Sequence, residues 1–166
     1  MREVLKKHSS GMVVVKDSAV DYTLASPTIG PNKKPMWCGC VLLKKSAVTY
    51  HLMPLYFNPK LEEAIPPELL ARKQGKTCFN FQRPDEQLFA KLDALTAMGR
   101  EQWERRGFLT PGTISMEQME EAVRAGGIDT AALARERKAK GKAAAAKRAV
   151  TLKKKADATA KRRAGA

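Results

Sequence analysis

The sequence predicts a small globular domain of mixed strands and helices, followed by a cationic tail. All ten aromatic residues lie between Tyr22 and Phe108, so the apolar material for a core is confined to the first part of the chain. In that part, short β-branched runs alternate with helical patterns. Between Leu133 and Ala166 there are 13 basic and 2 acidic residues, a net charge of +11, whereas residues 1–132 carry only +3. A chain of 166 residues has room for one domain and an appendage, which excludes a large multidomain enzyme.

The N-terminal half is predicted to contain one short helix and four strands. In chain order we expect a helix at 2–8, strands at 12–15 and 21–25, a loop at 26–35, and a hairpin of strands 36–43 and 47–53. The loop is rich in proline and glycine, which favour turns. The hairpin has the clearest pattern, because a short polar turn, Lys44 to Ser46, separates two apolar runs. Pro54 ends the last strand, since it cannot donate to a ladder.

The following segments are predicted to form mainly helices. We expect short helices at 61–64 and 67–73, a strand at 77–81, a long helix from Asp85 to about 106, and a helix from Ser115 to about 125. In the strand, Cys78 and Asn80 alternate with apolar neighbours and share one side. Asp85 is a good N-cap, and Ser115 and Gln118 have the spacing of a capping box.

Three segments of the chain resemble motifs of a known family. They are Lys34–Val41, with its Lys-x-Pro-aromatic start, Tyr50–Tyr56, which resembles a central strand, and Gln74–Phe81, with a glycine-lysine turn before a strand. Over about residues 13–109 the chain thus resembles the YdhG-like family of small bacterial domains of unknown function. The resemblance implies an α+β fold in which a curved antiparallel sheet has helices packed on one face. We therefore expect a domain at 1–109, a linker and accessory helix at 110–132, and a basic tail at 133–166.

The superfamily includes frataxin-like iron chaperones, so the resemblance also implies a second function. Iron handling there depends on surface carboxylates, which are hard oxygen ligands. Glu62, Glu63, Asp85 and Glu86 are the acidic side chains available for it here.

The three cysteines suggest a soft metal site. Cys38 and Cys40 lie two residues apart, so on a regular strand both thiols face the same side. With His51 on the paired strand, they are candidate metal ligands, and Cys78 could join them. A redox pair and buried structural thiols are the alternatives. Disulfides are not expected in a reducing compartment.

A set of aromatic and basic residues could line a small-molecule pocket. The candidates are Trp37, Tyr50, His51, Tyr56 and Lys76. The alternative is that the aromatic residues only build the core. Gly75-Lys76 stands between a predicted helix and a strand, the reverse of a P-loop, so nucleotide hydrolysis is excluded. No nucleophile can be matched to a base from the sequence, so we expect a non-enzymatic protein without a cofactor.

The tail carries the strongest physical signal. Alanine separates its basic residues, like charges repel along a helix, and few apolar residues are present to bury. We therefore expect a disordered segment or a fluctuating helix that binds DNA or RNA without reading sequence, similar to the Lys/Ala tails of linker histones. A solubilising role and attraction to an anionic membrane are the alternatives, and the membrane role lacks an apolar face. The candidate nucleic-acid-binding residues are Arg135, Arg137, Lys138, Lys140, Lys142, Lys147, Arg148, Lys153, Lys154, Lys155, Lys161, Arg162 and Arg163.

The sequence contains no targeting signal that we can identify. No apolar run approaches the ~20 residues that cross a bilayer, and no apolar region follows the charged N-terminus. We expect no membrane association and a cytoplasmic protein that can associate with the nucleoid. The first hypothesis is therefore a nucleic-acid-binding protein, and the alternative is a metal-chaperone-like or small-ligand-binding domain.

Overall fold

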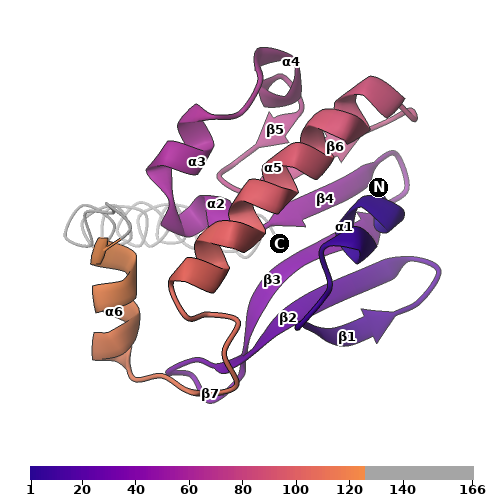
Figure 1. The fold of residues 1–166 in the computed structure, drawn as a ribbon. Helices are drawn as coiled ribbons and strands as arrows, with labels where there is room; N and C mark the ends of the chain where they lie inside the picture. Colours follow the sequence, from indigo (N-terminus) through magenta and orange to yellow (C-terminus); the bar gives the residue numbers. More distant parts are fainter. Residues whose placement is uncertain (126–166) are drawn as a thin grey trace, which may run out of the picture. The chain divides into compact units, whose positions relative to one another are not determined.

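A seven-stranded sheet forms the centre of the computed structural model, which describes residues 1–125 (Figure 1). Its strands are β1 (Val13–Asp17), β2 (Asp21–Ile29), β3 (Pro35–Leu43), β4 (Val48–Leu52), β5 (Lys73–Gln74), β6 (Cys78–Phe81) and β7 (Gly112–Thr113). The order across the sheet is β1-β2-β3-β4-β6-β5, and all these neighbours are antiparallel. The short strand β7 pairs in parallel with β2.

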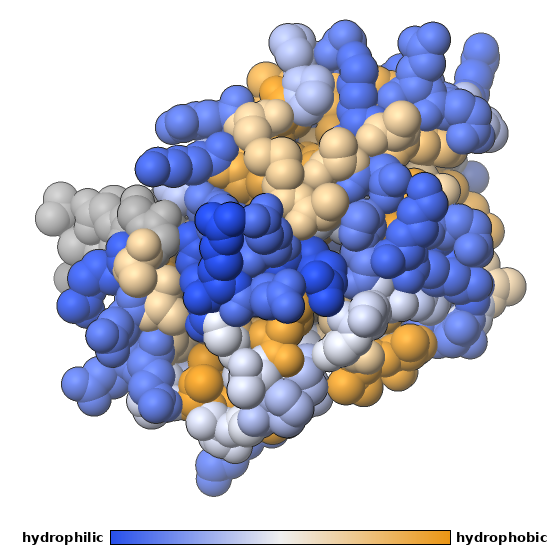
Figure 2. Space-filling view, in the orientation of Figure 1, coloured by the Kyte–Doolittle hydropathy of each residue, from blue (hydrophilic) through white to orange (hydrophobic). Residues whose placement is uncertain are grey.

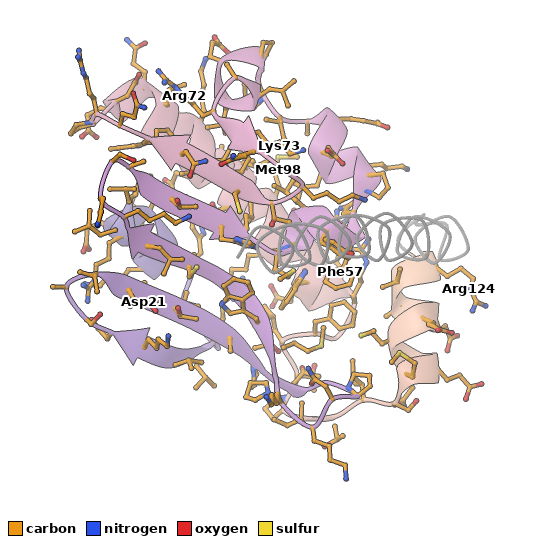
Figure 3. All side chains as sticks on the ribbon, turned by 180° about the vertical axis from the view of Figure 1, so that it is seen from behind. Asp21, Phe57, Arg72, Lys73, Met98 and Arg124 are labelled. Atoms are coloured by element: carbon orange, nitrogen blue, oxygen red, sulfur yellow. The ribbon has the colours of Figure 1, made fainter. Side chains whose placement is uncertain are left out.

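Helices pack against one face of this sheet. They are α1 (Arg2–Lys7), α2 (Pro54–Phe57), α3 (Pro59–Glu63), α4 (Pro67–Leu70) and α5 (Glu86–Arg105). A further helix, α6 (Met116–Ala125), packs through Met119 and Ala122 against the cluster of Trp103 and Phe108. The long helix α5 runs across the strands at the front of Figure 1 and contacts α1, α2, α3 and α4. The reverse view shows the strands in front of the helices (Figure 3). The expected α+β fold with an antiparallel sheet is confirmed.

The alternation of side chains gives the sheet two different surfaces. Tyr50 and Phe79 are fully buried with the helices in the main core. We call this surface the helix face. The next residue along each strand points the other way. We call that opposite surface the polar face; it carries Thr23, Cys40, Thr49, His51, Cys78 and Asn80.

A β-bulge in β3 changes which face the cysteines occupy. Gly39 pairs with Leu24, but Ala25 pairs with Trp37, so Cys38 is an extra residue between them. As a result Cys38 packs with the buried side chains of Trp103 and Phe108. The prediction that Cys38 and Cys40 face the same side is therefore wrong, since the bulge interrupts the alternation on which it depended.

Gly39 leaves no room for a side chain at the bulge. A Cβ atom built on Gly39 would lie 2.6 Å from the backbone oxygen of His51 on β4. No larger residue fits there without moving one of the two strands. The close approach of β3 and β4 therefore requires glycine.

Several elements differ from the sequence prediction. Strand β2 continues to Ile29, although a loop was expected from Ser26. Pro27 is tolerated there because it lies within a register shift between Ala25 and Ile29, where its missing backbone N–H is not needed for pairing with β3. Helix α4 ends at Leu70, and the expected helical residue Lys73 instead begins β5. Helix α2 and strand β7 were not expected.

The predicted helix caps are confirmed. The carboxylate of Asp85 accepts a hydrogen bond from the backbone N–H of Leu88 at 3.0 Å, and α5 begins at the next residue after Asp85. At α6, Ser115 and Gln118 exchange hydrogen bonds in both directions, at 2.8 and 3.2 Å. Among the helices of residues 1–125, none combines the length and the apolar character needed to cross a membrane.

Candidate functional site

A single row of side chains runs across the polar face. Each residue of the row is paired in register with the next one on the neighbouring strand, so groups far apart in the sequence meet. In order across the sheet, the row is Lys16, Thr23, Cys40, His51, Cys78 and Gln74. Cysteine and histidine thus stand side by side at its centre, on strands β3, β4 and β6.

His51 connects two neighbours through its two ring nitrogens. Its Nδ1 lies 3.0 Å from Sγ of Cys78, and its Nε2 lies 2.7 Å from Oγ1 of Thr77. The indole of Trp37 lies against the imidazole, with ring centroids 4.6 Å apart. Cys78, His51 and Trp37 are half-buried, whereas Thr77 is buried. The imidazole is therefore held on both nitrogens and on one ring face.

Burial and a nearby positive charge favour the neutral form of His51. Burial lowers the pKa of His51, and the ammonium of Lys44 lowers it further. A neutral imidazole can accept a proton near neutral pH. Burial raises the pKa of the Cys40 thiol to about 12, with Asp21 adding to the effect. Burial also raises the pKa of Cys38 to about 12. Both of these thiols therefore remain protonated at neutral pH.

The polar residues around the row are satisfied by protein partners. Thr49 Oγ1 donates to Asn80 Oδ1 at 2.7 Å, and Asn80 Nδ2 donates to Gln74 Oε1 at 2.7 Å. Towards the other edge, Thr23 Oγ1 donates to Asp21 Oδ1 at 2.6 Å and Lys16 Nζ pairs with Asp21 Oδ2 at 2.9 Å. The hydrogen bond from Thr23 is the largest cause of a lowered pKa at Asp21, and the contact with Lys16 lowers it further.

The structure does not bring the expected metal ligands together. Cys38 lies in a buried cluster with Trp103, away from Cys40 and His51 on the polar face. Across residues 1–125, no three His, Cys, Asp or Glu side chains are grouped closely enough to hold a metal ion.

The carboxylates that the family resemblance offered for iron are in part occupied by structural contacts. Glu62 pairs with Lys73 at 2.5 Å, and Asp85 caps α5. Within residues 1–125 these carboxylates do not form a metal site, so the iron-chaperone function stays a prediction.

The expected ligand-pocket residues separate into three places. Tyr50 is fully buried on the helix face, and its hydroxyl lies 2.8 Å from Thr96 Oγ1 on α5. Trp37 and His51 lie against each other on the polar face, with their rings tilted by 36°. Lys76 Nζ lies 5.5 Å from the centre of the Tyr56 ring, a cation–π contact.

An apolar cavity that the sequence did not predict lies beside α6. Both tryptophans of the chain, Trp37 and Trp103, line it together with Phe57, in a volume of about 440 Å³. Figure 3 shows Phe57 on the side of the molecule that also carries α6. Four methionines complete the wall, Met36, Met53, Met116 and Met119. We call this space the methionine cavity. Its only sequence signal was the recurrence of methionine in three distant segments, because its walls come from β3 and the loop before it, the segment after β4, α5 and α6.

A second apolar cavity of about 350 Å³ lies at the other end of the sheet. Phe81, Phe89 and Leu43 are among its lining residues. Exposed apolar residues also occur on the edge strand β1, where Val13, Val14 and Val15 expose 45%, 48% and 52% of their surface. The orange area at the lower right of Figure 2 lies over this strand.

Comparisons with known proteins give no relative for this chain. The sequence matches no protein-family model and no curated protein, and the structure matches no solved structure. The resemblance to the YdhG-like family therefore stays a prediction. The basic residues expected to bind nucleic acid, from Arg135 to Arg163, lie outside the described residues.

Proposed function

We propose that the protein binds DNA or RNA without sequence preference through residues 133–166. The observation that carries the proposal is the net charge of +11 in this segment, which contains 13 basic and only 2 acidic residues. By contrast, many charges of residues 1–125 are paired within the fold, such as Lys16 with Asp21 and Lys91 with Glu68. The unbalanced positive charge is therefore concentrated in the tail. The proposal implies a cytoplasmic location with access to the nucleoid.

The salt dependence of binding measures how many phosphates the tail engages. Each neutralised phosphate contributes about −0.9 to the slope of log K against log salt for duplex DNA. With about six phosphates engaged, the slope is about −5, and affinity falls by about 10³ between roughly 50 and 200 mM salt. Lysine and arginine interleaved with alanine are suited to contact phosphates more than base edges, so unrelated sequences should bind alike.

The experiment compares two triple variants of the full chain that lose the same charge. In Lys153→Gln/Lys154→Gln/Lys155→Gln the tail loses three positive charges. In Lys33→Gln/Lys45→Gln/Lys60→Gln the folded part loses three exposed ones. Fluorescence anisotropy with two unrelated duplexes and one single-stranded RNA should show that only the tail variant flattens the salt slope, by about 2 to 3. An equal loss in both variants, or strong preference for one sequence, would contradict the proposal.

As a second candidate function, we propose that the methionine cavity binds a small apolar ligand. Its volume of about 440 Å³ lies in the range of ligand pockets, and its lining is mostly aromatic and methionine. Methionine is flexible and polarisable, so it adapts to apolar ligands of varied shape. Within residues 1–125, the indole Nε1–H of Trp103, one of the lining residues, is buried without an acceptor. The ligand class that fits the lining is a small apolar molecule.

The intrinsic fluorescence of the protein tests this candidate directly, because its two tryptophans both line the cavity. Titration with N-phenyl-1-naphthylamine, an uncharged apolar dye, should change tryptophan emission to saturation. Met119→Glu, which puts a charge in the wall, should abolish this change. The matched control is Leu43→Glu, which places the same charge at the second apolar cavity. If Leu43→Glu removes binding and Met119→Glu keeps it, the dye binds elsewhere and the candidate fails.

A further inference from the structure

The hydrogen-bonded set Cys78, His51 and Thr77 has the arrangement of a nucleophile and its base. A thiol and an imidazole nitrogen lie 3.0 Å apart, and a third group at 2.7 Å holds the other nitrogen of the ring. Activated cysteine nucleophiles are recognised by this geometry: a base within hydrogen-bond reach that is itself oriented by a neighbour. Neither the tail nor the methionine cavity makes use of this set.

The protonation state of His51 suits a base. With its proton on Nε2, the imidazole donates to Thr77 Oγ1, and Nδ1 accepts the S–H of Cys78. Burial, and then Lys44, lower the pKa of His51, so the neutral ring predominates near pH 7. Trp37 shields one face of the ring from water. The imidazole is therefore oriented and able to take the thiol proton.

The other charged and titratable groups of this face belong to its neighbouring strands. Lys44 follows β3 and acts on both His51 and Cys40. Asp21 and Lys16 lie further along the sheet and act on Cys40. At His51, the positive charge of Lys44 favours the neutral ring.

Exposure separates Cys78 from the other two cysteines. Cys38 and Cys40 are 3% and 1% exposed, and burial raises the pKa of each to about 12. Cys78 is half-buried, so it is the most exposed of the three cysteines. Strand β4 stands between Cys40 and Cys78, so the two sulfurs are not adjacent and a mixed disulfide on Cys78 has no neighbouring thiol to resolve it.

We propose that Cys78 is a modification site that undergoes thiol–disulfide exchange with small disulfides, with His51 as the base. The S–H proton passes to His51 Nδ1, and Sγ attacks one sulfur of the disulfide. The S–S bond breaks as the new S–S bond forms. The departing sulfur leaves with the electron pair and takes the proton from His51. One thiol and one disulfide give one thiol and one mixed disulfide, so no other oxidant takes part.

The experiment follows the reaction of the full-length native protein with two small disulfides, Ellman's reagent and oxidised glutathione. One thiol of the three should react rapidly, and mass mapping should place the adduct on Cys78. Cys78→Ser should remove the rapid phase. His51→Gln should slow it at least about tenfold at pH 7, as expected on loss of a general base, and Thr77→Val should slow it less.

Two controls separate catalysis from folding. The urea unfolding midpoint of each variant shows whether the fold is intact, and all thiols should react equally once the protein is unfolded. A native His51→Gln protein that reacts as fast as wild type would overturn the role of His51. A rapid adduct on Cys40 or Cys38 would overturn the assignment to Cys78. If the His51 variant fails to fold, two other measurements decide between the same outcomes. Thr77→Val must slow the reaction of Cys78 with the disulfide. Added thiol must reduce the wild-type adduct and restore the free Cys78 thiol.

Discussion

The two faces of strands β4 and β6 show how one pair of strands supports two kinds of chemistry. On the helix face, Tyr50 pairs with Phe79 and both are fully buried among apolar side chains. On the polar face, the adjacent pair of Thr49 and Asn80 is joined by a side-chain hydrogen bond. Neighbouring residues therefore serve different purposes. The helix face provides the apolar burial that stabilises the fold, and the polar face holds hydrogen-bonded groups at fixed separations.

The difference between the faces lies in polarity more than in exposure. Thr49 and Cys40 are 2% and 1% exposed, as low as many core residues. The polar atoms of this face are satisfied across strands, as in the contact of His51 with Thr77. A buried polar group costs little when it is hydrogen-bonded and much when it is not. The polar face should therefore depend more on its hydrogen bonds than on the burial of apolar area.

The largest expected effect comes from truncating the helix face. Leu52→Ala removes a side chain that is 1% exposed in the main core, which should lower the free energy of unfolding by about 3 kcal/mol. The matched control is Leu42→Ala, because Leu42 is half-buried on the polar face and should cost about 1 kcal/mol or less. Urea denaturation measures both. Equal losses of unfolding free energy would show that the two faces contribute alike and would contradict the expected difference.

A smaller effect is expected from deleting one hydroxyl on each face. Thr96 Oγ1 donates to the carbonyl of Leu92, so the Tyr50 hydroxyl donates to Thr96. Tyr50→Phe should cost about 1 kcal/mol, because the lost contact is fully buried. Thr49→Val should cost less, since Asn80 is half-buried and water can replace the threonine. Thermal or urea unfolding of the two variants measures the difference, and a larger loss for Thr49→Val would reverse the expected order.

The smallest effect is a pH dependence that belongs to the polar face. The pKa of His51 is lowered in the folded protein, so the unfolded chain binds a proton more readily as pH falls. The stability from the neutral ring is complete above the unfolded pKa of about 6.5 and is lost as pH falls towards the lower folded pKa. Unfolding curves between pH 7.5 and pH 5 should show this loss in wild type and not in His51→Gln. His8→Gln, which changes the chain's other histidine, should retain it.

Local sequence patterns predicted the parts of the fold that depend on neighbouring residues. The alternation around Phe79 placed Cys78 and Asn80 on one side of the strand, and the structure confirms it. The hairpin of β3 and β4 and the caps at Asp85 and Ser115 were also predicted correctly.

The rest depends on contacts between distant segments. The bulge at Cys38 follows from how β3 pairs with β2 and how closely Gly39 approaches His51, and neither is visible in the residues around it. The contact of Cys78 with His51 needs the pairing of β4 with β6, and the methionine cavity needs the position of α6. Sequence reasoning could name these residues but could not bring them together.

The extra residue at Cys38 shifts the alternation of side chains along β3 by one residue. Side chains of β3 that precede it are inverted relative to those that follow, so Trp37 emerges beside His51 while Cys38 turns inward. The bulge therefore absorbs one residue without moving Trp37 from the polar face, because deletion of Cys38 would leave Gly39 opposite Leu24 and Trp37 opposite Ala25. A residue gained or lost at this point changes the inner cluster and leaves the surroundings of the histidine in place.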